Sequence, residues 1–407
     1  MTFLSRIHLQ CIFLLISILL ISCNSEVSIS SNSSIPELLD RSEKIQFGKE
    51  WDFVQNMYAD KSQAILKNQN DNQAKLVLAQ LFIKEARVTG EHGHYYPSAL
   101  AMLTEVLSQQ DLDNDTKFMA LLHKAGVELS LHEFGTALQT AQQALVLNPR
   151  NAQIHGVLVD AYVELGDYEK AIAIADKMAM MKPDLRSYSR ISYLREIHGD
   201  IDGAIDAMGL AVNAGYPGYE ETAWAMQTLG ELYQRYDQIE NAKKVFENIL
   251  VMRPDYPFAV ASLAEIQLMN NDVINAEKTL NEAISIIPEV GFYVSLAHIY
   301  KDQNRLSELE NIKLEILEML EDDVVHGHNM NLEYTDLYLT LYDDPEKALV
   351  FIQKEYEKRP NNIDVNRKMA RVFQKLNDVE SSKIYAEAAS VTNSAHPELK
   401  HLQVELN

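Results

Sequence analysis

The chain has 407 residues, and 47% of them are hydrophobic, so it can bury a continuous core. Its few glycines and prolines, 15 and 11, favour helix over sheet and make all-α the expected fold class. The formal charge of −23 repels phosphate backbones and anionic lipid surfaces, which argues against nucleic acid as a partner; alternatively, the acidity only keeps a large surface soluble.

Residues 1–22 have the pattern of an export signal. Arg6 precedes an apolar run from Cys11 to Ile21, which has signal-peptide length and is too short to span a bilayer comfortably. The run ends in Leu20-Ile21-Ser22-Cys23, which resembles the lipobox of bacterial lipoproteins. This resemblance implies that Cys23 is acylated and becomes the mature N-terminus. The alternative is an ordinary secreted protein in which Cys23 has no such role.

The next two segments lead into the main body of the chain. Residues 23–36 are rich in Ser and Asn and predict a flexible tether. Residues 37–71 carry apolar residues at helical spacing, Trp51, Val54 and Met57 among them, and are predicted to form a leading helix pair, either a cap or a degenerate first repeat.

A repeated unit accounts for most of the remaining chain, and its clearest copy lies at residues 223–254. Small and large apolar residues alternate in that copy in the order Leu229, Gly230, Tyr233, Ala242, Phe246 and Pro254. Prolines that would end such units are 34 residues apart in two places, at Pro149 and Pro183 and at Pro254 and Pro288. This order and spacing resemble the tetratricopeptide (TPR) repeat. We expect about nine such units over residues 72–396, with a C-terminal tail at 397–407.

The TPR resemblance implies helical hairpins stacked into a right-handed superhelical solenoid, whose first helices line a concave groove. Two runs, Tyr95–Pro97 and Ser187–Glu196, are similar to bacterial TPR proteins of no assigned activity. Groove positions of peptide-binding TPR proteins, together with an arginine on the same face, give the expected partner-binding residues: Arg186, Ser189, Arg190, Tyr193, Trp224, Gln227, Glu231, Phe258 and Glu265.

Two parts of this set have alternative interpretations. Arg186, Arg190 and Tyr193 share one helix face and could bind an acidic peptide or a C-terminus. Alternatively, the arginines pair with acids of neighbouring repeats, such as Asp160, Glu164, Glu220 or Glu221. Trp224 could anchor a partner, or it could simply cover core.

Two His-x-His motifs, His92-Gly93-His94 and His326-Gly327-His328, are predicted to lie in loops. The first falls where eight residues beyond the repeat length are expected to loop out. Imidazole pairs at this spacing can bind a metal, with Glu91, Asp322 or Asp323 as oxygen ligands. However, packed helices at 8–10 Å each would place the two motifs roughly tens of ångströms apart. The alternative is solvated loop histidines.

The sequence contains no HExxH, G-x-S-x-G or CxxC motif and no phosphate-binding glycine loop, so we expect no enzyme, no cofactor and no small-molecule substrate. The predicted function is a lipid-anchored TPR scaffold of the bacterial cell envelope, on the outer membrane and facing the periplasm or the cell surface. It would bind partner proteins or peptides in its groove. The alternatives are a metal-binding envelope protein that uses the His-Gly-His motifs, and an enzyme with an unrecognised site.

Overall fold

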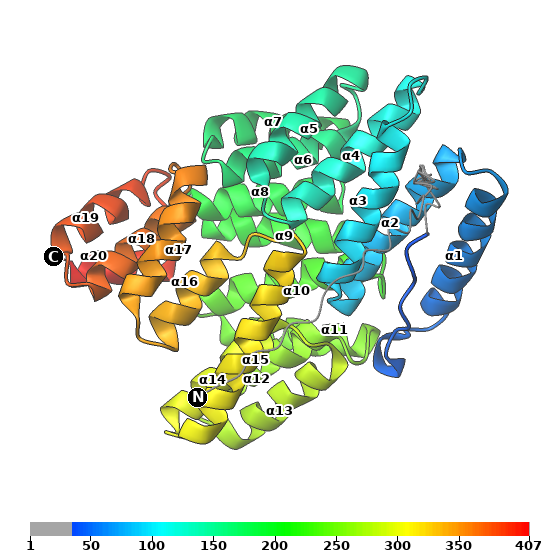
Figure 1. Ribbon diagram of the computed structural model, residues 1–407. Helices are drawn as coiled ribbons and strands as arrows, with labels where there is room; N and C mark the ends of the chain where they lie inside the picture. The colour runs from blue at the N-terminus through cyan, green and yellow to red at the C-terminus, as the bar shows by residue number, and fades with distance from the viewer. Residues whose placement is uncertain (1–34, 407) are drawn as a thin grey trace, which may run out of the picture. The chain divides into compact units, whose positions relative to one another are not determined.

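The computed structural model describes residues 35–406; the expected signal peptide, Cys23 and nearly all of the expected tether lie outside this range. Within it, every regular element is a helix, which confirms the all-α fold class (Figure 1). None of the helices between residues 35 and 406 combines the length and the hydropathy needed to cross a bilayer.

The elements of the described residues follow one another with short links. In chain order they are the 3-10 turn η1 (Glu43–Ile45), α1 (Glu50–Lys67), α2 (Asn72–Thr89), α3 (His92–Leu107), α4 (Asn114–Ser130), α5 (Phe134–Leu147), α6 (Ala152–Glu164), α7 (Tyr168–Met181), α8 (Leu185–Ile197), α9 (Ile201–Ala214), α10 (Glu220–Arg235), α11 (Ile239–Met252), α12 (Pro257–Met269), α13 (Val273–Ile286), α14 (Val290–Asp302), α15 (Leu306–Val325), α16 (Asn331–Thr340), α17 (Pro345–Lys358), α18 (Ile363–Lys375), α19 (Val379–Ala388) and α20 (Pro397–Glu405).

The helices from α2 to α19 form nine successive hairpins, and consecutive hairpins pack on each other. Between the seventh hairpin (α14 and α15) and the eighth (α16 and α17), buried side chains of one hydrophobic cluster make the contact. α1 packs on α2 at one end of the series, and α20 packs on α18 and α19 at the other. The expected leading helix pair is instead the single helix α1, preceded by residues 37–49, which are irregular apart from η1 and a turn and which we call the N-terminal segment. The apolar spacing read from the sequence lies within α1 alone.

The turn between the two helices of each hairpin contains a residue with positive φ. These residues are Gly90, His132, Gly166, Gly199, Asp237, Asn271, Asn304, Asp343 and Asn377. The left-handed region suits Gly, and Asn and Asp tolerate it better than other side chains do, so the sequence at this position reflects the turn. His132 is the one histidine in the series.

The first hairpin lacks the expected insertion loop. α2 ends at Thr89 and α3 begins at His92, so only two residues connect them. The extra residues lengthen the two helices, and His92-Gly93-His94 forms the first turn of α3. The expectation that this motif lies in a loop is therefore wrong, because helix length rather than loop length absorbs the insertion.

The best repeat copy shows why small residues recur at the helix crossings. A Cβ added to Gly230 in α10 would lie 2.3 Å from the ring of Phe246 in α11, so the two helices meet at a distance only glycine allows. Phe246 is fully buried, beside Ala242 and Ile249. Close approach at glycine and filling by phenylalanine together form the core of this unit.

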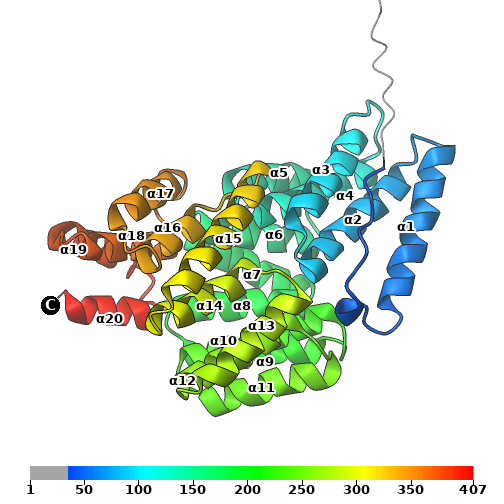
Figure 2. The same cartoon turned by 60° about the horizontal axis from the view of Figure 1, so that its bottom comes forward.

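The second half of the series packs back against the first half. The backbone N–H of Ile363 at the start of α18 donates to the Tyr168 hydroxyl of α7 at 2.8 Å, and Asn362 donates to the carbonyl of Glu164 at 3.0 Å. Gly166 fits only as glycine, since its φ is +78° and a Cβ would lie 2.4 Å from the Asn361 carbonyl. Further along, α15 contacts α3, and the two run close together in Figure 2.

Candidate functional site

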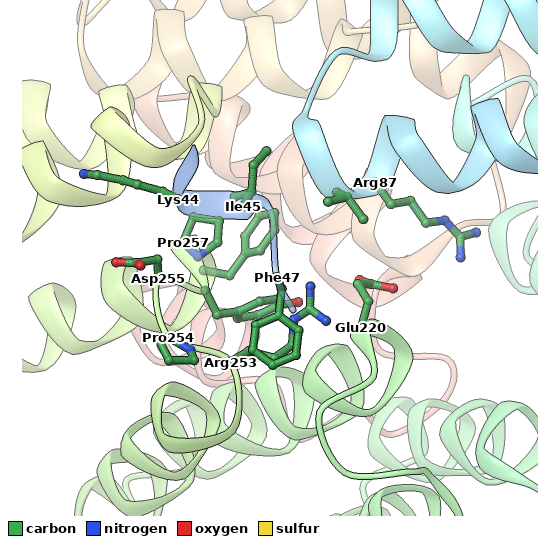
Figure 3. Close-up of a pocket in the computed structure, with 12 residues that line it drawn as sticks. Lys44, Ile45, Phe47, Arg87, Glu220, Arg253, Pro254, Asp255 and Pro257 are labelled. Carbon is green, nitrogen blue, oxygen red and sulfur yellow. The ribbon is translucent and has the colours of Figure 1, made fainter. Parts of the chain in front are cut away.

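The N-terminal segment occupies a hollow beside α12 that would otherwise be open. Ile45 packs into the core there, and Phe47 lies over the guanidinium of Arg253, 4.8 Å from ring centroid to Cζ (Figure 3). The Phe258 side chain lines the same hollow and packs edge-on against Phe292 at 5.7 Å between ring centroids. Phe258, one of the expected groove residues, therefore contacts the chain itself.

The face of α8 is also engaged within the chain. Arg190 donates to Asp160 of α6 at 2.8 Å, which confirms the neighbouring-repeat pairing predicted as the alternative to peptide binding. The Tyr193 hydroxyl donates to Asp364 of α18 at 3.2 Å. Ser189 is buried. Of the four expected residues on α8, only Arg186 is exposed.

The face shared by α10 and α12 remains open to solvent. Trp224 is 45% exposed, so it does not merely cover core, and Glu231 and Glu265 are exposed beyond it. We call Trp224, Glu231 and Glu265 the α10–α12 face. Beneath them the buried Gln227 donates to Ser262 at 2.7 Å and to Glu231 at 2.9 Å, which fixes the spacing of the two helices.

The α10–α12 face carries negative charge that the chain only partly balances. Burial by surrounding protein raises the pKa of the Glu231 carboxyl above its usual value, and the same cause raises the pKa of Glu265, which is also near Glu231. Both side chains are exposed to solvent, and Gln234 donates to Glu265 at 3.0 Å. A cationic group of a partner would relieve the repulsion.

The two His-Gly-His motifs meet in the structure, so the expectation that they lie tens of ångströms apart is wrong. The ring centroids of His92 and His328 are 6.1 Å apart, and a Cβ on Gly93 would lie 2.9 Å from Nδ1 of His326. The spacing estimate assumed a series of hairpins that never returns on itself. Here α15 packs beside α3, so the motif His326-Gly327-His328 at the end of α15 lies next to the motif His92-Gly93-His94 at the start of α3.

One histidine of each motif joins Asp323 of α15 in a tight group. A nitrogen from His92, a nitrogen from His328 and a carboxylate oxygen of Asp323 all lie within 4.8 Å of one another. The His328 side chain is only 10% exposed, and neither of its ring nitrogens has a hydrogen-bond partner among the described residues. Burial lowers the pKa of His92, which keeps its imidazole neutral and able to act as a ligand.

The other histidine of each motif is engaged elsewhere. His94 Nε2 lies 2.8 Å from the carbonyl of Glu37 in the N-terminal segment. His326 Nδ1 lies 2.8 Å from the carbonyl of Asp322 and 3.3 Å from its carboxylate. The four histidines suggested by the sequence therefore separate into two that converge and two that do not.

Two residues that sequence reasoning missed border this group. The ring of His132 lies 4.6 Å from that of His328, between centroids. Burial and repulsion from Asp323 raise the pKa of Glu289 to about 7, a direction that nearby positive charge would reverse. A histidine at the positive-φ turn position, where the other hairpins have Gly, Asn or Asp, was the signal available in the sequence for His132.

Comparison with known proteins agrees with this architecture. The tetratricopeptide repeat family model matches residues 128–195, which extend from the end of α4 into α8. Anaphase-promoting complex subunit 7 of Arabidopsis thaliana is 27% identical over 176 residues, which are 42% of this chain and 30% of that protein.

Two solved structures show partial likeness. TTC0263, a thermophilic TPR protein in Thermus thermophilus, has 20% identity and a TM-score of 0.42 over 48% of this chain and 99% of that one. Pseudomonas aeruginosa pilF has 14% identity and a TM-score of 0.41 over 54% of this chain and 99% of that one. The family match shows a tetratricopeptide repeat at residues 128–195, and helical hairpins continue on both sides of that match.

Proposed function

We propose that the chain is an interaction scaffold that binds a cationic segment of a partner protein on the α10–α12 face. Stacked helical hairpins suit protein recognition, because a preformed surface loses little conformational entropy on binding. The observation that carries the proposal is the exposed Trp224 on the same face of α10 as the exposed Glu231, seven residues further on, with the exposed Glu265 on the neighbouring α12. An indole anchor next to anionic side chains fits a lysine or arginine flanked by apolar residues.

The internal contacts narrow the surface that was expected from the sequence. Tyr193 and Arg190 bond to acids of the chain, Ser189 and Gln227 are buried, and Phe258 packs against the chain's own aromatic rings. These residues hold the scaffold together. Recognition is therefore assigned to the exposed positions of α10 and α12, with recognition rather than catalysis as the role.

The test is photocrosslinking in cells from a reactive amino acid placed at Trp224 or at Glu265, followed by mass spectrometry. The same protein should be captured from both positions and not from Ile274, an exposed position on α13. Glu231→Lys with Glu265→Lys should abolish capture. The matched control, Glu247→Lys with Glu282→Lys on the exposed sides of α11 and α13, should leave it intact. Equal capture by both double variants would contradict the proposal.

We also propose that Cys23 is acylated and holds the scaffold on a bacterial envelope membrane. The support is the lipobox-like run that ends at Cys23. Two or more acyl chains would hold a protein far more firmly than one. Metabolic labelling with a palmitate analogue should label the natural chain but not Cys23→Ala, and equal labelling would refute the anchor.

A further inference from the structure

We propose that His92, Asp323 and His328 form a binding site for a divalent transition metal, zinc in the first place, that joins the first hairpin to the end of α15. The three ligand atoms come from the start of α3, the last turn of α15 and the loop after it. Two imidazoles and one carboxylate are a ligand set that zinc uses in proteins, with a fourth position left for water or another group.

The three ligand atoms are already close to the spacing of a bound ion. They lie within 4.8 Å of one another, whereas ligands bonded at 2.0–2.1 Å in a tetrahedron are about 3.3 Å apart. Small side-chain rotations are enough to close that difference. His92 stacks on Tyr96 at 5.3 Å between ring centroids, so its ring is already held on one side.

The ring nitrogens of His328 lack the partners that burial normally demands. A buried imidazole usually satisfies its nitrogens with hydrogen bonds, because a buried polar group without a partner destabilises the fold. His328 is nine-tenths buried, and both nitrogens lack such a partner within residues 35–406; the nearest anion is Asp323 at 3.9 Å from Nδ1. A metal bonded to one nitrogen explains why this residue occupies such a site.

Charge also favours a cation at this position. The Asp323 carboxylate is one of the three ligands, and a carboxylate oxygen of Glu289 lies 4.0 Å from the position of a Cβ on Gly90, two residues before His92. A divalent cation among the ligands would offset the negative charge of these two carboxylates. Glu289 at the start of α14 and His132 after α4 stand outside the three ligands, where neighbours commonly orient a metal site.

The chain itself supplies a matched control. His94 and His326 are the other histidines of the same two motifs, and both bond to groups other than the three ligands. The control variant His94→Ala with His326→Ala removes one imidazole from each motif, as does the test variant His92→Ala with His328→Ala. Asp323→Asn adds a variant of nearly the same shape that lacks the anionic oxygen.

The experiment uses the full chain freed of metal with a chelator and then titrated with zinc by calorimetry. We expect a single zinc ion bound per chain in the natural protein and in the control variant. The His92/His328 variant should bind at least about 100-fold more weakly, because even outer-shell changes at zinc sites cost 10–100-fold. Asp323→Asn should weaken binding in the same direction.

Two further measurements separate a lost ligand from a lost fold. Zinc should raise the Tm of the natural chain and of the control but not that of the His92/His328 variant. The Tm values and the helical circular dichroism of the metal-free proteins show whether each variant is still folded. Cobalt(II) should give the visible spectrum of a tetrahedral site in the natural chain and in the control, and not in the His92/His328 variant. The proposal is overturned if the natural chain binds no stoichiometric zinc, or if the control variant loses affinity as much as the His92/His328 variant.

Discussion

Replacing Arg41 with methionine should release the N-terminal segment from the hairpins. The Arg41 guanidinium donates to both oxygens of Glu85 in α2 at 2.7 Å, and it donates to Glu50 at 3.0 Å. The Arg41 and Glu85 side chains are both fully buried. Arg41→Met therefore leaves a buried carboxylate without its cation, which costs about 3–5 kcal/mol in comparable pairs. Glu50 would keep Arg253 at 3.2 Å, so the loss centres on Glu85.

A second substitution distinguishes the cost of the orphaned charge from the value of the pair. In Arg41→Met with Glu85→Met, both charges of the fully buried pair are removed while Glu50 keeps Arg253 as its partner, and apolar replacement of a buried pair is often neutral or stabilising. We therefore expect the double variant to recover most of the loss, within about 1–2 kcal/mol of the natural chain.

The assay is urea unfolding monitored by circular dichroism, combined with hydrogen exchange of the backbone amides of residues 37–49. Exchange should accelerate in that segment first, because local opening needs only its own contacts to break. A loss of less than about 1 kcal/mol in Arg41→Met, or an equal loss in the single and double variants, would contradict the role given to the buried ion pair.

The close helix crossing and the last helix give two other predictions. Gly230→Ala places a Cβ 2.3 Å from Phe246 and should lower the free energy of unfolding by urea by about 1–3 kcal/mol. In the control Gly126→Ala, the new Cβ meets no atom within 4 Å, so the free energy of unfolding should be unchanged or slightly higher. Equal losses of stability in the two variants would contradict the close crossing of α10 and α11. His396 Nδ1 accepts from the backbone N–H of Glu398 at 3.3 Å, and burial beside two arginines lowers its pKa to about 4. Because the unfolded chain takes up this proton near pH 6.5, stability from His396 should be complete above that pH and should fall by about 1–3 kcal/mol as the pH drops toward 4. His396→Asn keeps a cap acceptor and should flatten this dependence in hydrogen exchange of α20; an unchanged pH profile would refute the assignment.

The parts of the structure that were predictable from the sequence are those that repeat at short range. Gly230 and Phe246 fixed the register of one hairpin, and the 34-residue proline spacing extended it to neighbours. The pairing of Arg190 with Asp160 was foreseeable for the same reason, since it joins successive repeats. Each of these contacts depends on residues that the repeat period already places side by side.

The parts that were not predictable join elements far apart in sequence. Nothing in the repeat period places Asp364 on Tyr193, or His328 beside His92, because a repeat pattern describes only nearest neighbours. For the same reason, only part of the candidate metal site could be predicted from the sequence. The histidine motifs could be recognised, but which histidine of each pair converges depends on how α15 returns to α3.

Because the second half of the hairpin series packs on the first half, some contacts of the first half cannot form until the second half has been synthesised. Tyr193 and the residue it bonds, Asp364, are 171 positions apart. At about 5–20 residues per second, a ribosome needs about 10–30 s to make the intervening chain. During that interval the face of α8 lacks its cover, so a nascent chain presents a surface that the finished protein hides.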